Sequence, residues 1–340
     1  MANDSASPKP IVGLIMTGGG ARAAYQVGVV RALHEILPKD VRNPFPIICG
    51  TSAGAINAAV LATDAGNFHR GARRLMTVWK NFHVEQVYRA DAWGALGNSA
   101  RWLLTALSGG SLDGAVSLLD NSPLADLLGR HVDFPAIGRN VNAGHLRAFA
   151  VTCSGYTSGQ SVTFYEGKAS LSDWARARRV GVAMPIGLPH LMASSALPFI
   201  FPPVLINREY FGDGSMRQIA PVSPALHLGA DRLLVIGVGR QAKQSAVRLP
   251  SNGYPLRAVD FRVVTPSVPL SQIAAQYAHD LPRVIRGLLR TVGAMKRTGS
   301  NLVSYLLFEK AYCRALIQLG YRDTLAQKDD LLAFLGYGQQ

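Results

Sequence analysis

The chain of 340 residues has few cysteines, few acidic residues and no long apolar run. Its three cysteines, Cys49, Cys153 and Cys313, lie far apart and form no C-x-x-C pair, which argues against a disulfide framework and a zinc site. No uninterrupted apolar stretch reaches roughly 18 residues, so no transmembrane helix is predicted. The opening MANDSASPKP lacks the apolar core of a secretory signal. We therefore expect a cytoplasmic protein that can associate with membranes only at their surface.

Acidic residues are scarce relative to basic ones: 21 Asp and Glu stand against 35 Lys and Arg, a formal net charge of +14. Such an excess of basic residues bears on binding partners rather than on the fold. It would fit a protein that contacts an anionic membrane, and equally a soluble protein with a basic surface. No nucleic-acid motif accompanies the charge, so we do not expect nucleic-acid binding. Residues 282–297 carry apolar side chains at helical spacing among five basic ones, which fits either a helix in an anionic lipid interface or a core helix with a solvated basic face.

Alternating strand and helix patterns occupy the first part of the chain. Residues 11–16 form an apolar run without period, typical of a buried parallel strand, and residues 24–36 carry apolar side chains at helical spacing. Residues 46–50 and 55–65 repeat this pair of strand and helix. We therefore predict an α/β fold, a three-layer α/β/α sandwich with a mainly parallel central sheet. Further strands are predicted at 146–153, 161–167 and 231–239.

Changes in composition predict the domain organisation. We expect a disordered tail at 1–9 and a catalytic domain at 10–240. A helical insertion at about 81–140 contains the Gly-rich stretch 94–116, which suits a lid or a packing insertion. After the catalytic domain the composition becomes polar and rich in Pro and Gly, which indicates a linker. Helical patterns follow it, so residues 241–340 are predicted to form a linker and a helical C-terminal extension packed on the core.

The first glycine-rich turn, TGGGARAA (17–24), stands between the first strand and the first helix. Bare backbone N–H groups at a helix N-terminus hold negative charge. Gly18, Gly20 and Ala23 fit the dinucleotide pattern G-x-G-x-x-[GA], yet the same loop could hold a transient oxyanion in acyl transfer. The dinucleotide alternative expects an acidic residue where the second strand ends, and the chain has CGTS there.

The second turn, Gly50-Thr51-Ser52-Ala53-Gly54, matches G-x-S-x-G between a strand and a helix. In that context the strained turn lifts the serine hydroxyl clear of the sheet, and the small neighbours let backbone and substrate approach. Ser52 is therefore a candidate nucleophile, and the alternative is a packing turn of small residues. A serine needs a base. None of the histidines after Ser52 falls in an obvious loop that follows a strand, so we expect each of them to be structural.

Asp213 is the other candidate. The stretch NREYFGDGS (207–215) predicts a hairpin that ends in an Asp-Gly turn, with the carboxylate between Gly212 and Gly214. The alternative is an ordinary Asp-Gly turn without a chemical role. With an ordinary pKa of about 3.9, an aspartate is a poor base for a hydroxyl. Asp213 could serve only in a desolvated pocket with a strong oxyanion site.

The motifs TGGGAR, GTSAG and GDG, in that order, together with HLMASSALPFIFPPV and GADRLLVIGVG, resemble the patatin-like phospholipases over roughly residues 10–240. The resemblance implies a patatin-like fold and a Ser–Asp dyad without histidine, in which Ser52 is the nucleophile and Asp213 the base. No cofactor or metal is expected. The substrate would be a lipid ester, and a phospholipid is the first expectation.

The resemblance also assigns supporting residues. Backbone N–H groups of Gly18, Gly19 and Gly20 would form the oxyanion hole, and Arg22 would help to fix that loop. Gly50, Gly54 and Gly214 would support the turns at the nucleophile and the acid. This chain has Ala23 where many members have glycine, and Ser215 where Gly or Ala often follows Asp-Gly. Neither departure touches the dyad.

The sequence thus predicts a serine lipid acyl hydrolase, of phospholipase A or esterase type, with an acyl-enzyme on Ser52. A non-phospholipid esterase, a thioesterase or an acyltransferase with the same dyad stays open. A nucleotide-binding oxidoreductase that uses Gly18 and Gly20 is the most distant alternative. A catalytically silent membrane-binding protein that keeps the fold is a third.

Overall fold

The computed structural model describes residues 9–89, 117–217, 222–239, 259–291 and 300–338. Most of the predicted tail, the whole Gly-rich stretch 94–116 and the end of the predicted amphipathic helix at 292–297 lie outside these residues. Within the described ranges, no helix combines the length and the apolar character that a membrane span requires.

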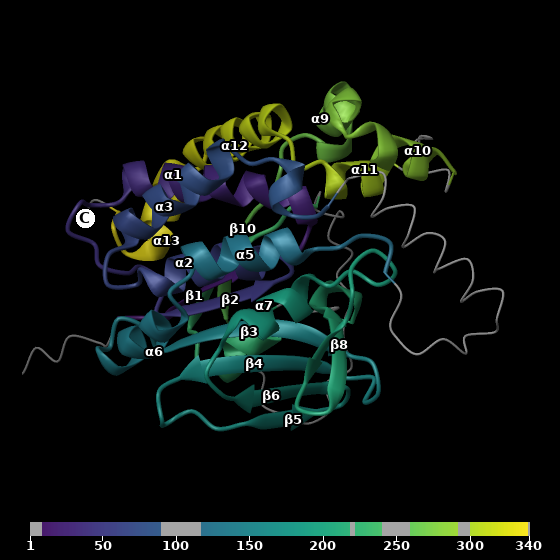
Figure 1. Ribbon diagram of the computed structural model, residues 1–340. Helices are drawn as coiled ribbons and strands as arrows, with labels where there is room; N and C mark the ends of the chain where they lie inside the picture. Colours follow the sequence, from purple (N-terminus) through teal and green to yellow (C-terminus); the bar gives the residue numbers. More distant parts are fainter. Residues whose placement is uncertain (1–8, 90–116, 218–221, 240–258, 292–299, 339–340) are drawn as a thin grey trace, which may run out of the picture.

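A ten-stranded sheet runs through the described part of the chain (Figure 1). Its strands are β1 (Val12–Met16), β2 (Ile47–Thr51), β3 (Ala148–Gly155), β4 (Ser161–Gly167), β5 (Trp174–Arg176), β6 (Arg179–Ala183), β7 (Val204–Ile206), β8 (Glu209–Asp213), β9 (Arg232–Ile236) and β10 (Asp260–Val264). The order is β10-β9-β1-β2-β3-β4-β6-β5, and the β7–β8 hairpin pairs with the end of β3. The five strands from β10 to β3 are parallel, whereas β3–β4, β3–β8, β5–β6 and β7–β8 are antiparallel.

Helices cover both faces of the sheet, but unequally (Figure 1). The helices are α1 (Ala24–Ile36), α2 (Ala53–Thr63), α3 (Phe68–Lys80), α5 (Ser122–His131), α6 (Phe134–Asn142), α7 (Leu188–Ser195), α8 (Ser223–His227), α9 (Leu270–Tyr277), α10 (Arg283–Thr291), α11 (Ser300–Leu306), α12 (Lys310–Leu325) and α13 (Lys328–Leu335), with short 3-10 turns η1 (Gly20–Ala23), η2 (Val84–Gln86), η3 (Gly214–Met216) and η4 (Ala278–Asp280). The larger core cluster contains residues of α1 to α3, α5 to α7 and α12, and the smaller one those of α8. This arrangement confirms the predicted three-layer α/β/α architecture.

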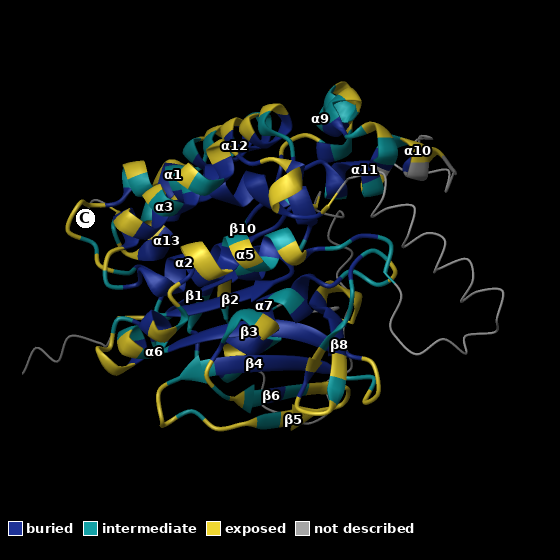
Figure 2. Cartoon of the chain, in the orientation of Figure 1, coloured by how far each residue is buried: buried dark blue, intermediate teal, exposed yellow. Residues whose placement is uncertain are grey.

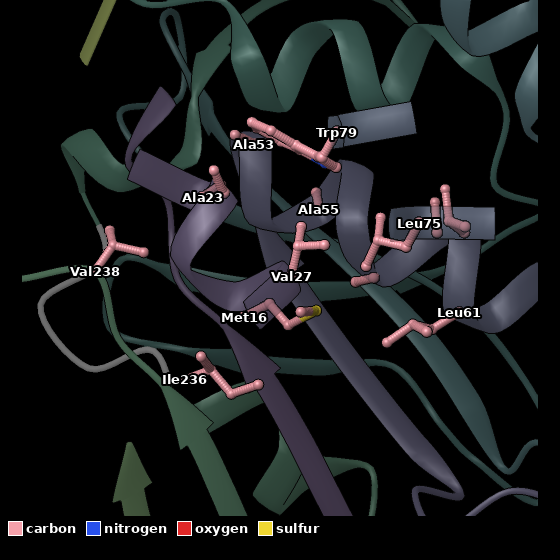
Figure 3. Close-up of a cluster of buried hydrophobic side chains, with 14 of the residues drawn as sticks. Met16, Ala23, Val27, Ala53, Ala55, Leu61, Leu75, Trp79, Ile236 and Val238 are labelled. Carbon is pink, nitrogen blue, oxygen red and sulfur yellow. The ribbon is translucent and has the colours of Figure 1, made fainter. Parts of the chain in front are cut away.

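Alternation along the strands divides the core between the two faces. On β1, Leu14 and Met16 belong to the larger cluster, while Ile15 belongs to the smaller one. Figure 3 shows Met16 among the larger cluster beside Val27 of α1, with the small Ala55 of α2 beyond Val27. The central strands are buried throughout (Figure 2). Their continuous apolar runs therefore reflect burial on both faces, as predicted for parallel strands.

Two elements differ from the sequence predictions. The β7–β8 hairpin turns at Asn207 and Arg208, both with positive φ, and not at the Asp-Gly pair, which ends β8 instead. β10 begins within the stretch interpreted as a linker and extends the sheet beyond β9. Its residues 260–262 are exposed, as in an edge strand, so they lack the apolar run that marked the buried strands.

The C-terminal helix α12 packs on α1 at unusually short distance. A Cβ built on Gly28 of α1 would collide with the carbonyl oxygen of Ile317, and one on Gly320 of α12 with that of Tyr25. Only glycine at both positions permits this approach of the two backbones. The C-terminal helices are thus part of the same molecule-wide core as the first helix.

Candidate active site

The sheet brings Ser52 and Asp213 together through one shared neighbour, β3. Along one edge of β3, β2 pairs as far as Thr51 opposite Thr152. At the next residue of β3, Cys153, the antiparallel β8 takes over with Asp213 as its last residue. The ends of β2 and β8 therefore meet head to head. This is why two residues 161 positions apart in the chain lie in hydrogen-bond contact.

Ser52 stands in a strained turn. Its φ is 55° and its ψ −135°, a conformation that costs a non-glycine residue of order 1–3 kcal/mol. Its backbone N–H donates a 2.8 Å hydrogen bond to Ser194 Oγ, and that hydroxyl donates to the carbonyl oxygen of Thr152 on β3. Cβ atoms at Gly50 and Gly54 would collide with the backbone of Ala55 and of Met16. The predicted glycines thus allow the turn, and Ser194 holds it.

Asp213 is fully buried and accepts several hydrogen bonds. Oδ2 accepts from Ser52 Oγ at 2.6 Å, and Oδ1 accepts from the backbone N–H of Ser215 at 2.8 Å. Its own N–H donates to the carbonyl oxygen of Ala196. Burial raises the pKa of Asp213, and the hydrogen bonds that it accepts only partly oppose this. The aspartate is therefore more basic than an exposed one. A Cβ at Gly214 would collide with the carbonyl oxygen of Thr152, so the backbone after the acid requires glycine.

The glycine-rich loop lies directly against Ser52. A Cβ on Gly18 would approach Ser52 Cβ to 2.9 Å, and Gly20 has a φ of +57°, which favours glycine. Among the described residues, no acceptor is found for the backbone N–H groups of Gly18, Gly19 and Gly20. Unpaired amides beside a buried hydroxyl can donate to an oxygen that becomes negative during acyl transfer.

A buried network of side-chain hydrogen bonds supports this loop. Gln26 Nε2 donates to the carbonyl oxygen of Thr17, the residue before the glycines, and Asn57 Nδ2 donates to Gln26 Oε1. Trp79 Nε1 donates in turn to Asn57 Oδ1. Helices α1, α2 and α3 are thereby tied to the loop. No sequence pattern identifies these residues, because their pairing exists only in the folded chain.

Arg22 connects the loop to the C-terminal region. Its Nε donates to Ser304 Oγ at 2.8 Å, and its Nη2 donates to the backbone oxygen of Asn301 at 2.6 Å and to the side-chain oxygen of the same residue at 3.1 Å. Both partners lie on α11. Arg22, which was predicted to fix the glycine-rich loop, therefore also holds α11. This helix lies beyond residues 10–240, over which the chain resembles the family.

Helix α11 contributes a residue that the sequence analysis missed. Tyr305 OH lies 3.0 Å from Ser52 Oγ and donates a 3.0 Å hydrogen bond to Asp213 Oδ2. Its carbonyl oxygen and ring lie on Gly20, where a Cβ would collide with them. A lone tyrosine in a helical pattern carries no local signal of such a contact.

An apolar pocket begins at Ser52. Its lining residues are Gly20, Ser52, Ala53, Ile56, Val60, Leu75, Val78, Trp79, Phe82, Val87, Leu124, Leu127, Leu128, His131, Val132, Ser195, Phe201, Tyr305 and Phe308. Two of these residues, Ile56 and Val60, stand about 6 Å and about 12 Å along α2 from Ser52, at 1.5 Å per helical residue. Only 1% of the surface of Ser52 is exposed. Such a lining suits a hydrocarbon chain.

The histidines take no part in the contact between Ser52 and Asp213. Within the described residues, none donates to or accepts from Ser52 or Asp213; His69, for example, bonds His34 and the carbonyl oxygen of Pro38. His131 lines the pocket at the end of α5. The same residues contain no group of three or more His, Cys, Asp or Glu that could hold a metal ion.

Comparisons with known proteins identify the family of this chain. A family model described as patatin-like phospholipase matches residues 14–226, more than half of the chain. The lysophospholipase nte1 of Aspergillus terreus is 43% identical over 83 residues, which cover 23% of this chain and 5% of that protein. The enzyme of the same name from Aspergillus oryzae is 40% identical over 88 residues, 24% of this chain and 5% of that one. This chain thus matches a small part of these relatives.

Two solved structures align with nearly the whole chain at low similarity. VipD from Legionella pneumophila has a TM-score of 0.39 and 14% identity, over 95% of this chain and 67% of its own. Human GIVD cytosolic phospholipase A2, solved with methyl gamma-linolenyl fluorophosphonate, has a TM-score of 0.45 and 13% identity, over 96% of this chain and 59% of its own. The family match, which includes every predicted site residue from Gly18 to Gly214, decides the assignment. The chain belongs to the patatin-like phospholipase family.

Proposed function

We propose that this chain is a serine lipid acyl hydrolase, of phospholipase A or esterase type, with Ser52 as nucleophile and Asp213 as base. The observation that carries the proposal is the 2.6 Å hydrogen bond from Ser52 Oγ to Asp213 Oδ2 beside an apolar pocket. A nucleophile within hydrogen-bond reach of its base is the arrangement that covalent catalysis requires. The family and its lysophospholipase relatives support a lipid ester as substrate.

The reaction has two half-reactions. Ser52 Oγ attacks the carbonyl carbon of the ester, and its proton passes to Asp213 Oδ2. The carbonyl oxygen becomes negative and accepts hydrogen bonds from the amides of Gly18 to Gly20, and each such donor is worth about 10²–10³ in kcat. The bond to the alcohol then breaks, and its oxygen takes the proton from Asp213. A water molecule next gives a proton to Asp213 and attacks the acyl-enzyme, which releases the fatty acid and returns the proton to Ser52.

The raised pKa of Asp213 explains how an aspartate can act in place of histidine. Burial disfavours its charged form, so the carboxylate accepts a proton more readily than an exposed one would. Its burial and the neighbouring amides of Gly18 to Gly20, for which the described residues offer no acceptor, support this role. The loop glycines face Ser52 and the backbone of Tyr305, which suits a transient oxyanion rather than a bound pyrophosphate.

The substrate within this chemistry is proposed to be a phospholipid. The same dyad would also cleave a neutral ester or a thioester, or pass the acyl group to an alcohol. A lipidomic comparison of wild-type protein with Ser52→Ala, incubated with mixed lipid extracts, distinguishes these products. Free fatty acid with lysophospholipid supports the proposal, whereas a new ester or acid from neutral lipid alone contradicts the phospholipid assignment.

Two matched pairs of variants test the dyad. Ser52→Ala and Asp213→Asn should each lower ester hydrolysis by several orders of magnitude while the protein stays folded. Ser154→Ala is the control for the first, because Ser154 is equally buried and its Oγ has no hydrogen-bond partner among the described residues. Asp64→Asn is the control for the second, since Asp64 is a buried carboxylate that pairs with Arg70 away from the pocket. A fluorophosphonate probe should label wild type but not Ser52→Ala. Turnover near wild type in either dyad variant contradicts the mechanism.

We further propose that the site is reached from an anionic lipid surface through exposed residues next to Asp213. Met216 is 58% exposed and Tyr210 49% exposed, and both flank the acid in sequence. Tyr156 donates its N–H to the carbonyl oxygen of Tyr210, and Arg217 follows Met216 as an exposed cation. Apolar side chains mixed with basic ones are typical of interfacial contact.

The predicted helix at 282–297 is less suited to that contact. In the part described as α10, Ile285 and Leu289 are buried against the protein, so these two side chains of its apolar stripe pack on the core. The exposed Arg283 and Arg290 remain available to anionic lipid.

A further inference from the structure

The oxygen atoms of Ser52, Asp213 and Tyr305 form a nearly regular triangle. Ser52 Oγ lies 2.6 Å from Asp213 Oδ2, and Tyr305 OH lies 3.0 Å from each of those two atoms. Both hydroxyls therefore donate to the same carboxylate oxygen. Tyr305 belongs to α11, beyond the residues 14–226 that the family model matches. The family's own pattern does not account for a third hydroxyl on the reacting atoms.

The position of Tyr305 is held by several contacts, so the triangle is not a chance approach of a loose side chain. Arg22 donates two hydrogen bonds to Asn301, one helical turn before the tyrosine, and one to Ser304, the residue directly before it. Tyr88 OH donates a 2.9 Å hydrogen bond to the carbonyl oxygen of Leu306, the next residue. The absence of a side chain at Gly20 lets the tyrosine backbone and ring lie on the glycine-rich loop. The loop and α11 thus fix each other.

We propose that Tyr305 is a third catalytic residue. Its phenolic hydroxyl donates a hydrogen bond to the alcohol oxygen that leaves in acylation, and to the oxygen of the water that attacks in deacylation. The inference rests on the proposed dyad, because it requires proton transfer from Ser52 to Asp213. In the resting site the phenol donates to Asp213 Oδ2. Once that oxygen carries the proton of Ser52, it is a weaker acceptor, and the phenol can turn to another oxygen. An oxygen bonded to the carbon that Ser52 attacks lies within a few ångströms of Oγ, and thus near Tyr305 OH.

The protons balance without loss of the phenol. The bond from Ser52 Oγ to its proton breaks, the proton moves to Asp213 Oδ2, and the bond from Oγ to the acyl carbon forms. The bond from that carbon to the alcohol oxygen breaks as Asp213 returns the proton to the alcohol. Tyr305 keeps its own proton throughout and stabilises the partial negative charge on the departing oxygen. In deacylation it orients the attacking water in the same place.

Electrostatics keeps the phenol available as a donor. Burial and the nearby charge of Asp213 raise the pKa of Tyr305 well above its ordinary value, although Ser52 and Arg22 oppose this. Tyr312, the other tyrosine near Arg22, also has its pKa raised by burial. Tyr305 therefore keeps its phenolic proton more firmly than an exposed tyrosine does. A hydroxyl that is always a donor suits a partner that becomes negative only during the reaction.

Tyr305→Phe tests the proposal, because it removes one oxygen and keeps the ring on Gly20. Stabilisation of a departing oxygen matters for a poor leaving group and little for a good one. We expect kcat/KM for an alkyl ester to fall about 100-fold, within the range seen on removal of one transition-state donor. For the p-nitrophenyl ester of the same acid, whose leaving oxygen needs no proton, kcat/KM should change by less than about threefold. The rate of fluorophosphonate labelling at Ser52 should also stay near that of wild type.

Tyr88→Phe is the matched control, because its hydroxyl anchors the same helix without contacting Ser52 or Asp213. A change that merely loosened α11 would lower kcat/KM for both esters by similar factors, in Tyr88→Phe as in Tyr305→Phe. The proposal is overturned if Tyr305→Phe lowers kcat/KM for both esters by similar factors. It is also overturned if kcat/KM for the alkyl ester is unchanged. Melting temperatures check that each variant is folded.

The proposal and the dyad fail in distinguishable ways. If Ser52→Ala retained the activity of wild type, the proposed function and the role of Tyr305 would fall together. If Ser52→Ala were inactive and Tyr305→Phe cleaved alkyl esters at the wild-type rate, only the role of Tyr305 would be wrong.

Discussion

The length of the apolar pocket predicts how the protein should discriminate among acyl chains. Ile56 and Val60 both line the pocket on α2, four and eight residues beyond Ser52. At 1.5 Å per residue, they stand about 6 Å and about 12 Å along the helix from the serine. Replacement by a larger side chain should therefore block the pocket at two different depths. Val60→Phe should leave room for short chains, and Ile56→Phe should exclude all but the shortest.

The magnitude follows from the burial of hydrocarbon. If a phenylalanine at position 60 displaces about three methylene groups of a long chain, the lost burial is about 2.4 kcal/mol, which is about 60-fold in kcat/KM. Chains that end before Val60 should lose less than about twofold. In Ile56→Phe, kcat/KM should begin to fall at a shorter acyl chain than in Val60→Phe. The difference in chain length should correspond to about one helical turn.

The assay is kcat/KM for p-nitrophenyl esters from butyrate to palmitate, with wild type and both variants. Each variant is its own control, because the short esters report whether Ser52 and Asp213 still react. Melting temperatures exclude a general cost of overpacking, which is about 1–3 kcal/mol in a filled core. A uniform loss at all chain lengths, or the same cutoff in both variants, would refute the assignment of this pocket to the acyl chain.

Two further predictions concern Asp213 and the exposed residues beside it. Because burial raises the pKa of Asp213, kcat/KM should fall on acidification with an apparent pKa above the ordinary value of about 3.9, and a limb at or below that value would count against Asp213 as base. Because the pKa of Asp213 is higher in the folded than in the unfolded chain, its ionisation costs stability as the pH rises from the ordinary value of about 3.9 through the folded-state pKa. Asp213→Asn should therefore raise the melting temperature at about pH 8 and lose this advantage toward about pH 3; a gain that grows on acidification contradicts the sign. Met216→Glu should weaken binding to anionic vesicles about tenfold, since burial of a methionine is worth about 1.5–3 kcal/mol, and should lower turnover of a water-soluble ester far less; equal losses in both assays count against the lipid contact.

Local patterns predicted the elements that begin and end within one short stretch. The apolar run before TGGGAR and the G-x-S-x-G turn identified β1, β2 and the helices after them, because buried parallel strands and tight turns leave continuous traces in sequence. β10 left no such trace, since an edge strand shows one side of its backbone to solvent and its exposed residues 260–262 are not an apolar run.

Contacts between distant segments were beyond these patterns. Ser194 holds the backbone of Ser52 from the end of α7, and Gln26 reaches Thr17 and Asn57 through one side-chain amide. Ser194 lies in the block HLMASSALPFIFPPV, whose likeness to a family was visible while its physical role was not. Tyr305 lacked even that signal. In each case the residue type is ordinary, and only the fold gives it a partner.

An aspartate that replaces histidine needs two opposite influences in balance. Burial makes the Asp213 carboxylate more basic, and hydrogen bonds from Ser52, Tyr305 and the N–H of Ser215 make it less so. Without donors a fully buried carboxylate would hold a proton at neutral pH and could not act as a base; with too many permanent donors it would not accept the proton of Ser52. In the proposed mechanism Tyr305 resolves this conflict because its hydrogen bond can leave. It stabilises the charged base before reaction and turns to the substrate oxygen once Asp213 is protonated, so the same hydroxyl serves both states.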